Sequence, residues 1–145
     1  MKLFTIGFTK KSAEAFFTKL KGAGVRRLID ARLNNQSQLS GFAKKNDLRY
    51  FLHEIGEIDY VHVPQLTPTQ DMLDAYKKHK GTWEAYEQSF LALLASRKIE
   101  EEFKPALFDD ACLLCSEHEP HHCHRRLVAE YLRDKWGDIE IEHLV

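Results

Sequence analysis

The sequence predicts an α/β fold: a single Rossmann-like three-layer domain over residues 1–145, with a mostly parallel sheet of about five strands. Short apolar runs alternate with longer segments whose apolar residues recur at helical spacing. One run, ACLLC at 111–115, is apolar on both faces, as a central parallel strand requires. No internal repeat or low-complexity tract interrupts this alternation.

Local signals define each element. We expect strands at 2–6, 25–30, 59–64, 111–115 and 139–145. We expect helices from Ser12 to Gly22, from Asp47 to Gly56, and over 69–79, 82–102 and 124–136. Ser12 is a good N-cap, and glycine is the residue that most often ends a helix. The polar stretch 33–46 is expected to be a long loop.

Composition narrows the class of protein. Lys plus Arg (21) nearly balances Asp plus Glu (22), so no global field favours nucleic acid or a membrane surface. No apolar run approaches the roughly 20 residues of a membrane helix. Three cysteines, an odd and small number, favour free thiols in the cytoplasm over a disulfide framework.

Reactive side chains follow the predicted strands. Because the carboxyl ends of parallel strands meet at one edge, where such sheets bind ligands, we expect these residues to converge. The candidate catalytic residues are Asp30, Cys115, Glu117 and Cys123, and the candidate substrate-binding residues are Arg32, Tyr60, His62, His124 and Arg125.

Cys112, Cys115, Cys123 and His124 offer four potential zinc ligands, but we assign no metal site. Residues three apart in a strand point to opposite faces, and the spacer between Cys112 and Cys115 lacks the glycine or proline of a tight zinc turn. We expect Cys112 to be a small buried hydrophobic residue.

An anion site fits the same stretch better. Cys123 stands where a helix begins, so unpaired backbone N–H groups and the positive end of the helix dipole meet the loop. His124 and Arg125 add positive charge, which attracts phosphate or carboxylate and favours a partly ionised Cys123 thiol. The alternative is that Cys123 only caps the helix.

Two acidic positions are candidates for catalysis. Asp30 and Arg32 share one side of an extended chain, so they either form an ordinary ion pair or divide a sugar hydroxyl and a phosphate between them. Glu117 follows a buried strand, where partial burial would favour its protonated form and suit it to acid–base catalysis. Tyr60 and His62 position a substrate or are ordinary half-buried strand residues.

These motifs resemble the DUF488 family, small α/β proteins of undefined function. The resemblance covers nearly the whole chain and rests on TIGFT (5–9), LIDARLNNQS (28–37), DYVHVPQL (59–66), LLCSEHEPHHCHR (113–125) and EHL (142–144). Its most specific element is Cys-x-Glu followed by Pro-x-x-Cys-His-Arg. The resemblance implies a Rossmann-like fold and supplies no established reaction.

Three functions remain open. The first is a hydrolase or transferase acting on an anionic nucleotide or nucleic-acid-derived substrate, with Glu117 or Asp30 as nucleophile or general base. The second is a thiol-based redox enzyme or sensor, in which Cys123 attacks and Cys115 resolves. The third is a non-enzymatic domain that binds a ligand, metal ion or partner. No cofactor is assigned, since Gly7 stands alone where an NAD fingerprint needs three glycines, and no Walker motif occurs.

Overall fold

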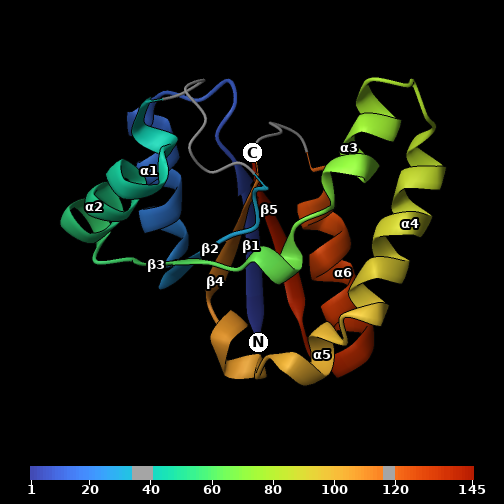
Figure 1. The fold of residues 1–145 in the computed structure, drawn as a ribbon. Helices are drawn as coiled ribbons and strands as arrows, with labels where there is room; N and C mark the ends of the chain where they lie inside the picture. Colours follow the sequence, from blue (N-terminus) through green and yellow to red (C-terminus); the bar gives the residue numbers. More distant parts are fainter. Residues whose placement is uncertain (34–40, 116–119) are drawn as a thin grey trace.

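The computed structural model describes residues 1–33, 41–115 and 120–145 and shows the predicted α/β fold (Figure 1). The strands are β1 (Lys2–Gly7), β2 (Arg27–Asp30), β3 (Asp59–His62), β4 (Ala111–Cys115) and β5 (Glu140–Leu144). The helices are α1 (Ala13–Ala23), α2 (Lys45–Gly56), α3 (Gln70–Lys77), α4 (Trp83–Ser96), α5 (Ile99–Glu102) and α6 (His124–Trp136). Half of the predicted loop 33–46, residues 34–40, lies outside the described residues. In the described part, Gly41–Ala43 forms a short 3-10 helix and α2 already begins at Lys45.

The five strands form one parallel sheet in the order β3-β2-β4-β1-β5. β4 is central and buried along its whole length, as its doubly apolar sequence predicts. α1 and α2 cover one face of the sheet, and α3, α4 and α6 cover the other, which gives three layers (Figure 1). The Rossmann-like three-layer prediction is confirmed.

The order of the strands creates a switch point between β1 and β4. These neighbours pair with Gly7 opposite Cys115 at their carboxyl ends. The chain leaves β1 toward α1 on one face and leaves β4 toward α6 on the other (Figure 1). Doubly wound sheets bind ligands beyond such a switch point, so a ligand site is expected at the carboxyl edge of this sheet.

Several helix bounds differ from the sequence prediction, and two of these differences have a local backbone cause. α1 runs past Gly22 to Ala23, and Gly24 adopts the left-handed conformation (φ 78°) that ends it. The single helix expected over 82–102 divides into α4 and α5, because Lys98 adopts φ 53°. This turn buries Ile99 in the core cluster that α4 and α6 share. The spacing of apolar residues over 82–102 did not predict the turn.

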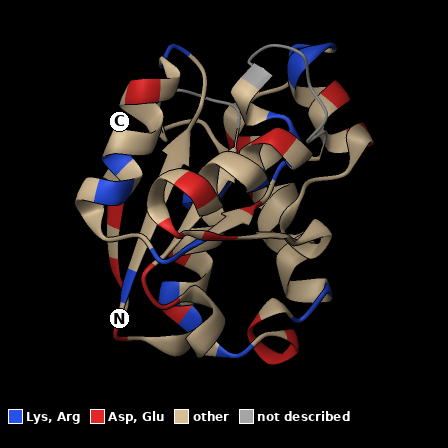
Figure 2. Ribbon diagram, turned by 90° about the vertical axis from the view of Figure 1, so that its left-hand side faces the viewer, with Lys and Arg blue, Asp and Glu red and all other residues tan. Residues whose placement is uncertain are grey.

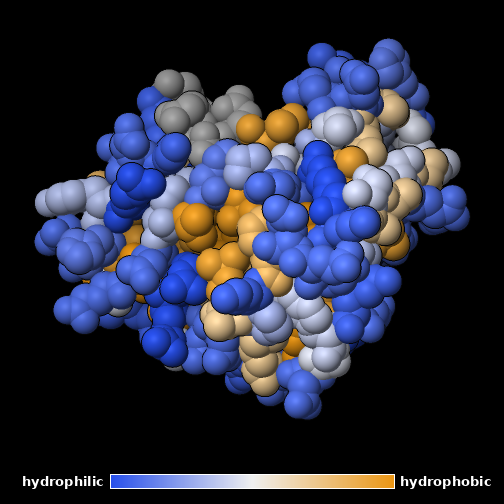
Figure 3. Space-filling view, turned by 60° about the horizontal axis from the view of Figure 1, so that its bottom comes forward, coloured by the Kyte–Doolittle hydropathy of each residue, from blue (hydrophilic) through white to orange (hydrophobic). Residues whose placement is uncertain are grey.

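Charged residues of both signs are interspersed over the α1–α2 side (Figure 2), in line with the balanced composition. Hydrophilic groups also cover most of the face shown in Figure 3, and apolar groups appear there in separate patches. Among the described helices, none combines the length and apolarity needed to cross a membrane.

Candidate functional site

A buried ion pair stands at the carboxyl end of β2. Nε and Nη2 of Arg32 donate to the two carboxylate oxygens of Asp30 at 2.8 and 2.9 Å. The backbone N–H of Arg32 donates to the same carboxylate at 3.1 Å. The side chains of Asp30 and Arg32 are only 0% and 2% exposed. Sequence spacing predicted that the two share a side, and the structure shows that they pair.

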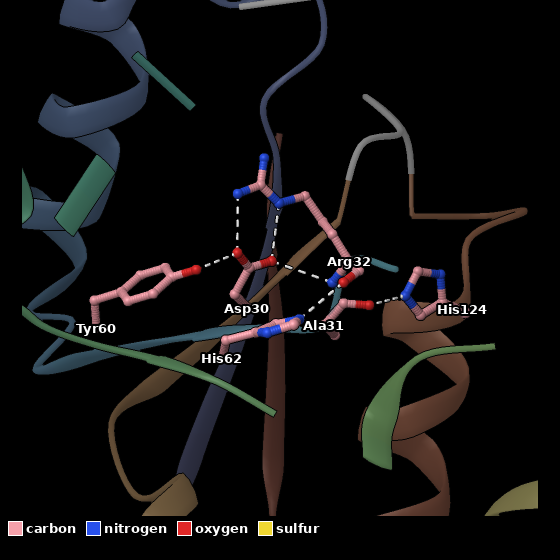
Figure 4. A network of polar contacts seen from close by, with 6 residues as sticks. All are labelled: Asp30, Ala31, Arg32, Tyr60, His62 and His124. Carbon is pink, nitrogen blue, oxygen red and sulfur yellow. Dashed lines mark hydrogen bonds and ion pairs between the residues drawn. The ribbon is translucent and has the colours of Figure 1, made fainter. Parts of the chain in front are cut away.

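The neighbouring strand β3 adds contacts to this ion pair. The two strands pair so that His62 lies opposite Asp30. The Tyr60 hydroxyl donates to Asp30 Oδ2 at 2.5 Å. The carbonyl oxygen of Arg32 can only accept, so Nε2 of His62 donates to it, at 3.1 Å. Figure 4 shows these side chains around the end of β2. Tyr60 and His62 therefore hold Asp30 and the Arg32 backbone in place.

One guanidinium nitrogen of Arg32 remains available. Nη1 is buried and has no hydrogen-bond partner among the described residues. Figure 4 shows it directed away from Asp30 and Tyr60. The Arg32 guanidinium also lies 5.4 Å from the centre of the Phe8 ring, just beyond β1. Phe8, which sequence reasoning missed, thus helps to fix the guanidinium, and its place directly after Gly7 at a strand end was the available signal.

The start of α6 approaches the same edge from the other face of the sheet. His124 Nε2 donates to the carbonyl oxygen of Ala31 at 2.6 Å and so joins α6 to the residue between Asp30 and Arg32 (Figure 4). Arg125 is fully buried, and its Nη1 donates to Cys115 Sγ at 3.0 Å. The guanidinium of Arg125 thus lies inside the protein beside a sulfur atom, and its contact with a substrate stays a prediction.

Cys115 and Cys123 form a disulfide, which corrects the expectation of free thiols at these two positions. The redox hypothesis required the two sulfurs to approach each other, because Cys115 can resolve an adduct of Cys123 only from nearby, whereas the cysteine count favoured free thiols. Cys112 is free and buried, as predicted. Burial raises the pKa of the Cys112 thiol far above its ordinary value, so Cys112 stays protonated.

Thr5 and His143 make a further polar contact on the α6 side of the sheet. Thr5 Oγ1 and His143 Nδ1 lie 2.6 Å apart, since β1 and β5 pair with Thr5 opposite His143. Burial, and then the charge of Arg125, lower the pKa of His143 below its ordinary value of 6.5. His143 is therefore held neutral near a buried guanidinium.

The site has two halves that straddle the end of the sheet. Asp30 points to the same face as Leu28, which packs with α1 and α2, whereas Cys115 points with Leu113 toward α4 and α6. The bond from His124 to Ala31 connects the two halves. The predicted convergence is thus observed for eight of the nine candidate residues, and Glu117 lies outside the described residues.

These contacts define what the edge can do chemically. The first half offers a guanidinium nitrogen for an anion, fixed by Asp30, Tyr60 and Phe8. The second offers a pair of sulfur atoms beside Arg125 and His124, and one atom from each of Cys115, Cys123 and His124 lies within 4.8 Å of the others. Anion binding, thiol–disulfide exchange and metal ligation are the chemistries available to such groups.

The fold and the edge together define a doubly wound α/β protein with a buried polar cluster at its topological switch point. The family described as "Domain of unknown function DUF488" matches residues 12–132, and the chain belongs to this family. Comparisons with curated proteins and with solved structures give no match.

Proposed function

We propose that this protein is an enzyme that acts on an anionic nucleotide or nucleic-acid-derived substrate, as a hydrolase or transferase at a sugar or phosphate group. The observation that carries the proposal is Arg32 Nη1, a buried cationic nitrogen with no partner among the described residues. A buried donor without an acceptor is costly, and a substrate oxygen would satisfy it. The preference for a nucleotide rests on the fold, since doubly wound sheets bind nucleotides at the switch point.

The contacts suggest how the roles divide. Both Asp30 oxygens already accept two hydrogen bonds each, from Arg32 and Tyr60, which favours Asp30 as the group that fixes the guanidinium. Glu117 is then the better candidate for nucleophile or general base. His124 and the first turn of α6 would meet the anion from the other side of β2, and Tyr60 and His62 would act as positioning residues.

Binding of inorganic phosphate and of a nucleoside monophosphate tests the anion site by calorimetry. We expect Arg32→Lys, which keeps the charge and loses the planar fork, to weaken binding about tenfold or more. Arg32→Gln should weaken it further. Arg27→Gln is the matched control, because Arg27 lies at the opposite end of the same strand. Equal affinity in the Arg32 variants, or an equal loss in Arg27→Gln, would overturn the assignment.

The catalytic part needs a separate test. In a screen for release of phosphate, sugar or base, we expect Glu117→Gln to abolish any turnover found with wild type. Cys123→Ser should retain turnover if the thiol only begins the helix and lose it if the thiol takes part. An activity that survives in both variants would show that the Cys-x-Glu and Cys-His-Arg elements do not carry catalysis.

A thiol-based redox enzyme or sensor is the second candidate, and the Cys115–Cys123 disulfide favours it. The Cys123 thiolate would attack a substrate disulfide, form a mixed disulfide and release one thiolate. Cys115 would then displace the second thiolate, so that the substrate is reduced and Cys115–Cys123 is oxidised. In a cytoplasmic protein, as the cysteine count suggests, a disulfide is more often catalytic or redox-sensing than structural.

Alkylation of the reduced protein distinguishes the two candidates. We expect Cys123 to react with iodoacetamide at a pH well below that at which an ordinary thiol ionises, because the backbone N–H groups at the start of α6 would stabilise the thiolate form. Cys112→Ala removes the unrelated third thiol from the measurement. A Cys123 that reacts only above about pH 8.5, like a free thiol, would contradict the redox function.

A further inference from the structure

Two sulfur atoms and an imidazole meet where β4 ends and α6 begins. One ligand atom from each of Cys115, Cys123 and His124 lies within 4.8 Å of the other two. Tetrahedral zinc holds sulfur at about 2.3 Å and nitrogen at about 2.0 Å, which separates neighbouring ligand atoms by about 3.3–3.8 Å. The three groups therefore need only small side-chain shifts to surround one ion, once the disulfide between the sulfurs is opened.

We propose that the dithiol form of this protein binds one thiophilic divalent metal ion, of the Zn²⁺ class, through Cys115, Cys123 and His124. The proposal goes beyond the anionic substrate and shares only His124 with the proposed anion site, since the sulfurs and Arg32 belong to opposite halves of the site. Its readout is metal uptake, so it can fail while phosphate binding at Arg32 holds. Three protein ligands leave a fourth tetrahedral position for water or another small ligand, as in catalytic rather than closed structural zinc sites.

The hydrogen bond of His124 fixes the tautomer that a metal requires. The Ala31 carbonyl oxygen can only accept, so Nε2 of His124 must carry the proton in the 2.6 Å bond. Nδ1 is then the ring nitrogen with the lone pair. Histidine ligands of metals characteristically donate their other N–H to a carbonyl or carboxylate, which orients the ring and raises its basicity. His124 already has this second contact.

Charge and burial also suit a metal. Cys115 and Cys123 are 1% and 3% exposed, so two thiolates there would be costly without compensation. Two thiolates cancel the charge of a divalent cation, and the N–H of Arg125 at 3.0 Å from Cys115 Sγ supports a thiolate ligand. Cys112, whose side chain points with Leu114 to the other face of β4, is excluded from the cluster.

The chemistry balances in two steps. A dithiol supplies two electrons and two protons to convert the disulfide to two thiols. A phosphine supplies two electrons and becomes a phosphine oxide, while water supplies the oxide oxygen and the two protons. Binding of the metal then releases two protons as the thiols become thiolates. The oxidised protein cannot present thiolates, so disulfide and metal exclude each other.

Titration with Co²⁺, the spectroscopic substitute for Zn²⁺, tests the site. The protein is reduced with a phosphine, freed of metal with a chelator and titrated under argon. We expect one Co²⁺ per chain, with sulfur-to-cobalt charge-transfer bands and the visible bands of tetrahedral cobalt, both displaced by Zn²⁺. The oxidised protein should give none of these bands.

Variants assign the ligands. Loss of an outer-shell partner alone costs about 10- to 100-fold in affinity, so Cys115→Ser and Cys123→Ser should each weaken binding by about 100-fold or more. His124→Gln, which keeps a donor for Ala31, should weaken binding while the charge-transfer bands remain. Cys112→Ala should bind like wild type. Circular dichroism checks that each variant is folded.

Absence of cobalt bands from folded, reduced wild type would overturn the proposal. So would equal uptake by the Cys115→Ser/Cys123→Ser double variant, or equal uptake by oxidised and reduced wild type. The last comparison uses one chain and holds even if a variant fails to fold.

Discussion

The two ends of β2 carry arginine–aspartate pairs of opposite character. At the amino end, Arg27 and Asp59 lie 4.0 Å apart with side chains 32% and 75% exposed. At the carboxyl end, Arg32 and Asp30 bond at 2.8 Å with side chains 2% and 0% exposed. An exposed pair contributes little to stability, whereas a buried pair carries a desolvation cost that its attraction barely offsets. The costly pair is thus at the edge where doubly wound sheets in general bind ligands.

A cavity at the amino end of β2 also differs from the carboxyl end in its charges. A cavity of about 570 Å³ there is lined by basic and acidic side chains together, among them Arg26, Arg27, Glu57, Asp59 and Asp109. Mixed charges in contact with solvent need no further partner. Cavity volume alone therefore does not distinguish the two ends of the sheet, and the buried, oriented guanidinium at the carboxyl end is the reason we propose a site there.

The largest expected effect comes from neutralising the buried acid. Asp30→Asn keeps the shape of the side chain but leaves the Arg32 charge unpaired, and we expect it to lower the free energy of unfolding by about 3–5 kcal/mol. Asp59→Asn at the other end should cost less than about 1 kcal/mol. Urea denaturation measures both differences.

A double variant separates charge from packing. Asp30→Asn with Arg32→Met removes both charges, so part of the stability lost in Asp30→Asn should return. If the double variant is as unstable as the sum of its single variants, the unpaired charge is not the cause.

Opening the Cys115–Cys123 disulfide should have the next largest effect. The disulfide joins residues eight apart in the sequence. In the chain-entropy account it lowers the entropy of the unfolded chain and so stabilises the folded protein by about 2.5 kcal/mol. We expect reductant with a chelator to lower the urea midpoint by the corresponding amount. The Cys115→Ser/Cys123→Ser variant should not respond to reductant; a response there, or none in wild type, would contradict the role of this bond.

Tyr60→Phe should come third. It removes a hydroxyl that donates to the Asp30 carboxylate at 2.5 Å, and hydrogen bonds to charged groups contribute about 1.5–3 kcal/mol. We expect a loss near the lower value, about 1.5 kcal/mol, because Arg32 still holds both carboxylate oxygens. Tyr50→Phe is the control, since Tyr50 is exposed on α2. Equal losses in the two variants would assign no special role to the Tyr60 contact.

Much of the fold was predictable because its signals are local. The doubly apolar run at 111–115 and the capped, periodic segment at 124–136 gave their elements with the observed bounds. Convergence of the reactive residues followed from parallel strands alone. The break at Lys98 was not predictable, since no residue there forces a left-handed conformation and burial of Ile99 decides it.

Partners across the sheet were beyond local signals. Tyr60 meets Asp30 only because β2 and β3 are neighbours in a particular register, and Thr5 meets His143 only because β5 adds beside β1. Arg125 was expected to add positive charge at an anion site, yet its position on α6 turns its side chain into the core. Strand order and helix rotation are tertiary properties, so spacing alone identifies the candidates and leaves their contacts open.

The smallest expected effect is a pH dependence at the carboxyl edge. Because burial and Arg125 lower the pKa of His143 in the folded protein, folding favours its neutral form. Neutral His143 therefore contributes fully to the free energy of unfolding when the pH is above 6.5, the ordinary pKa of histidine. This contribution is lost as the pH falls below that pKa. We expect the melting temperature of wild type to fall more between pH 7.5 and pH 5.5 than that of His143→Gln, which keeps a polar group for Thr5. The exposed His79, replaced by Gln, is the control and should follow wild type. Parallel profiles for wild type and His143→Gln would show that the neutral histidine does not contribute to the stability of this edge.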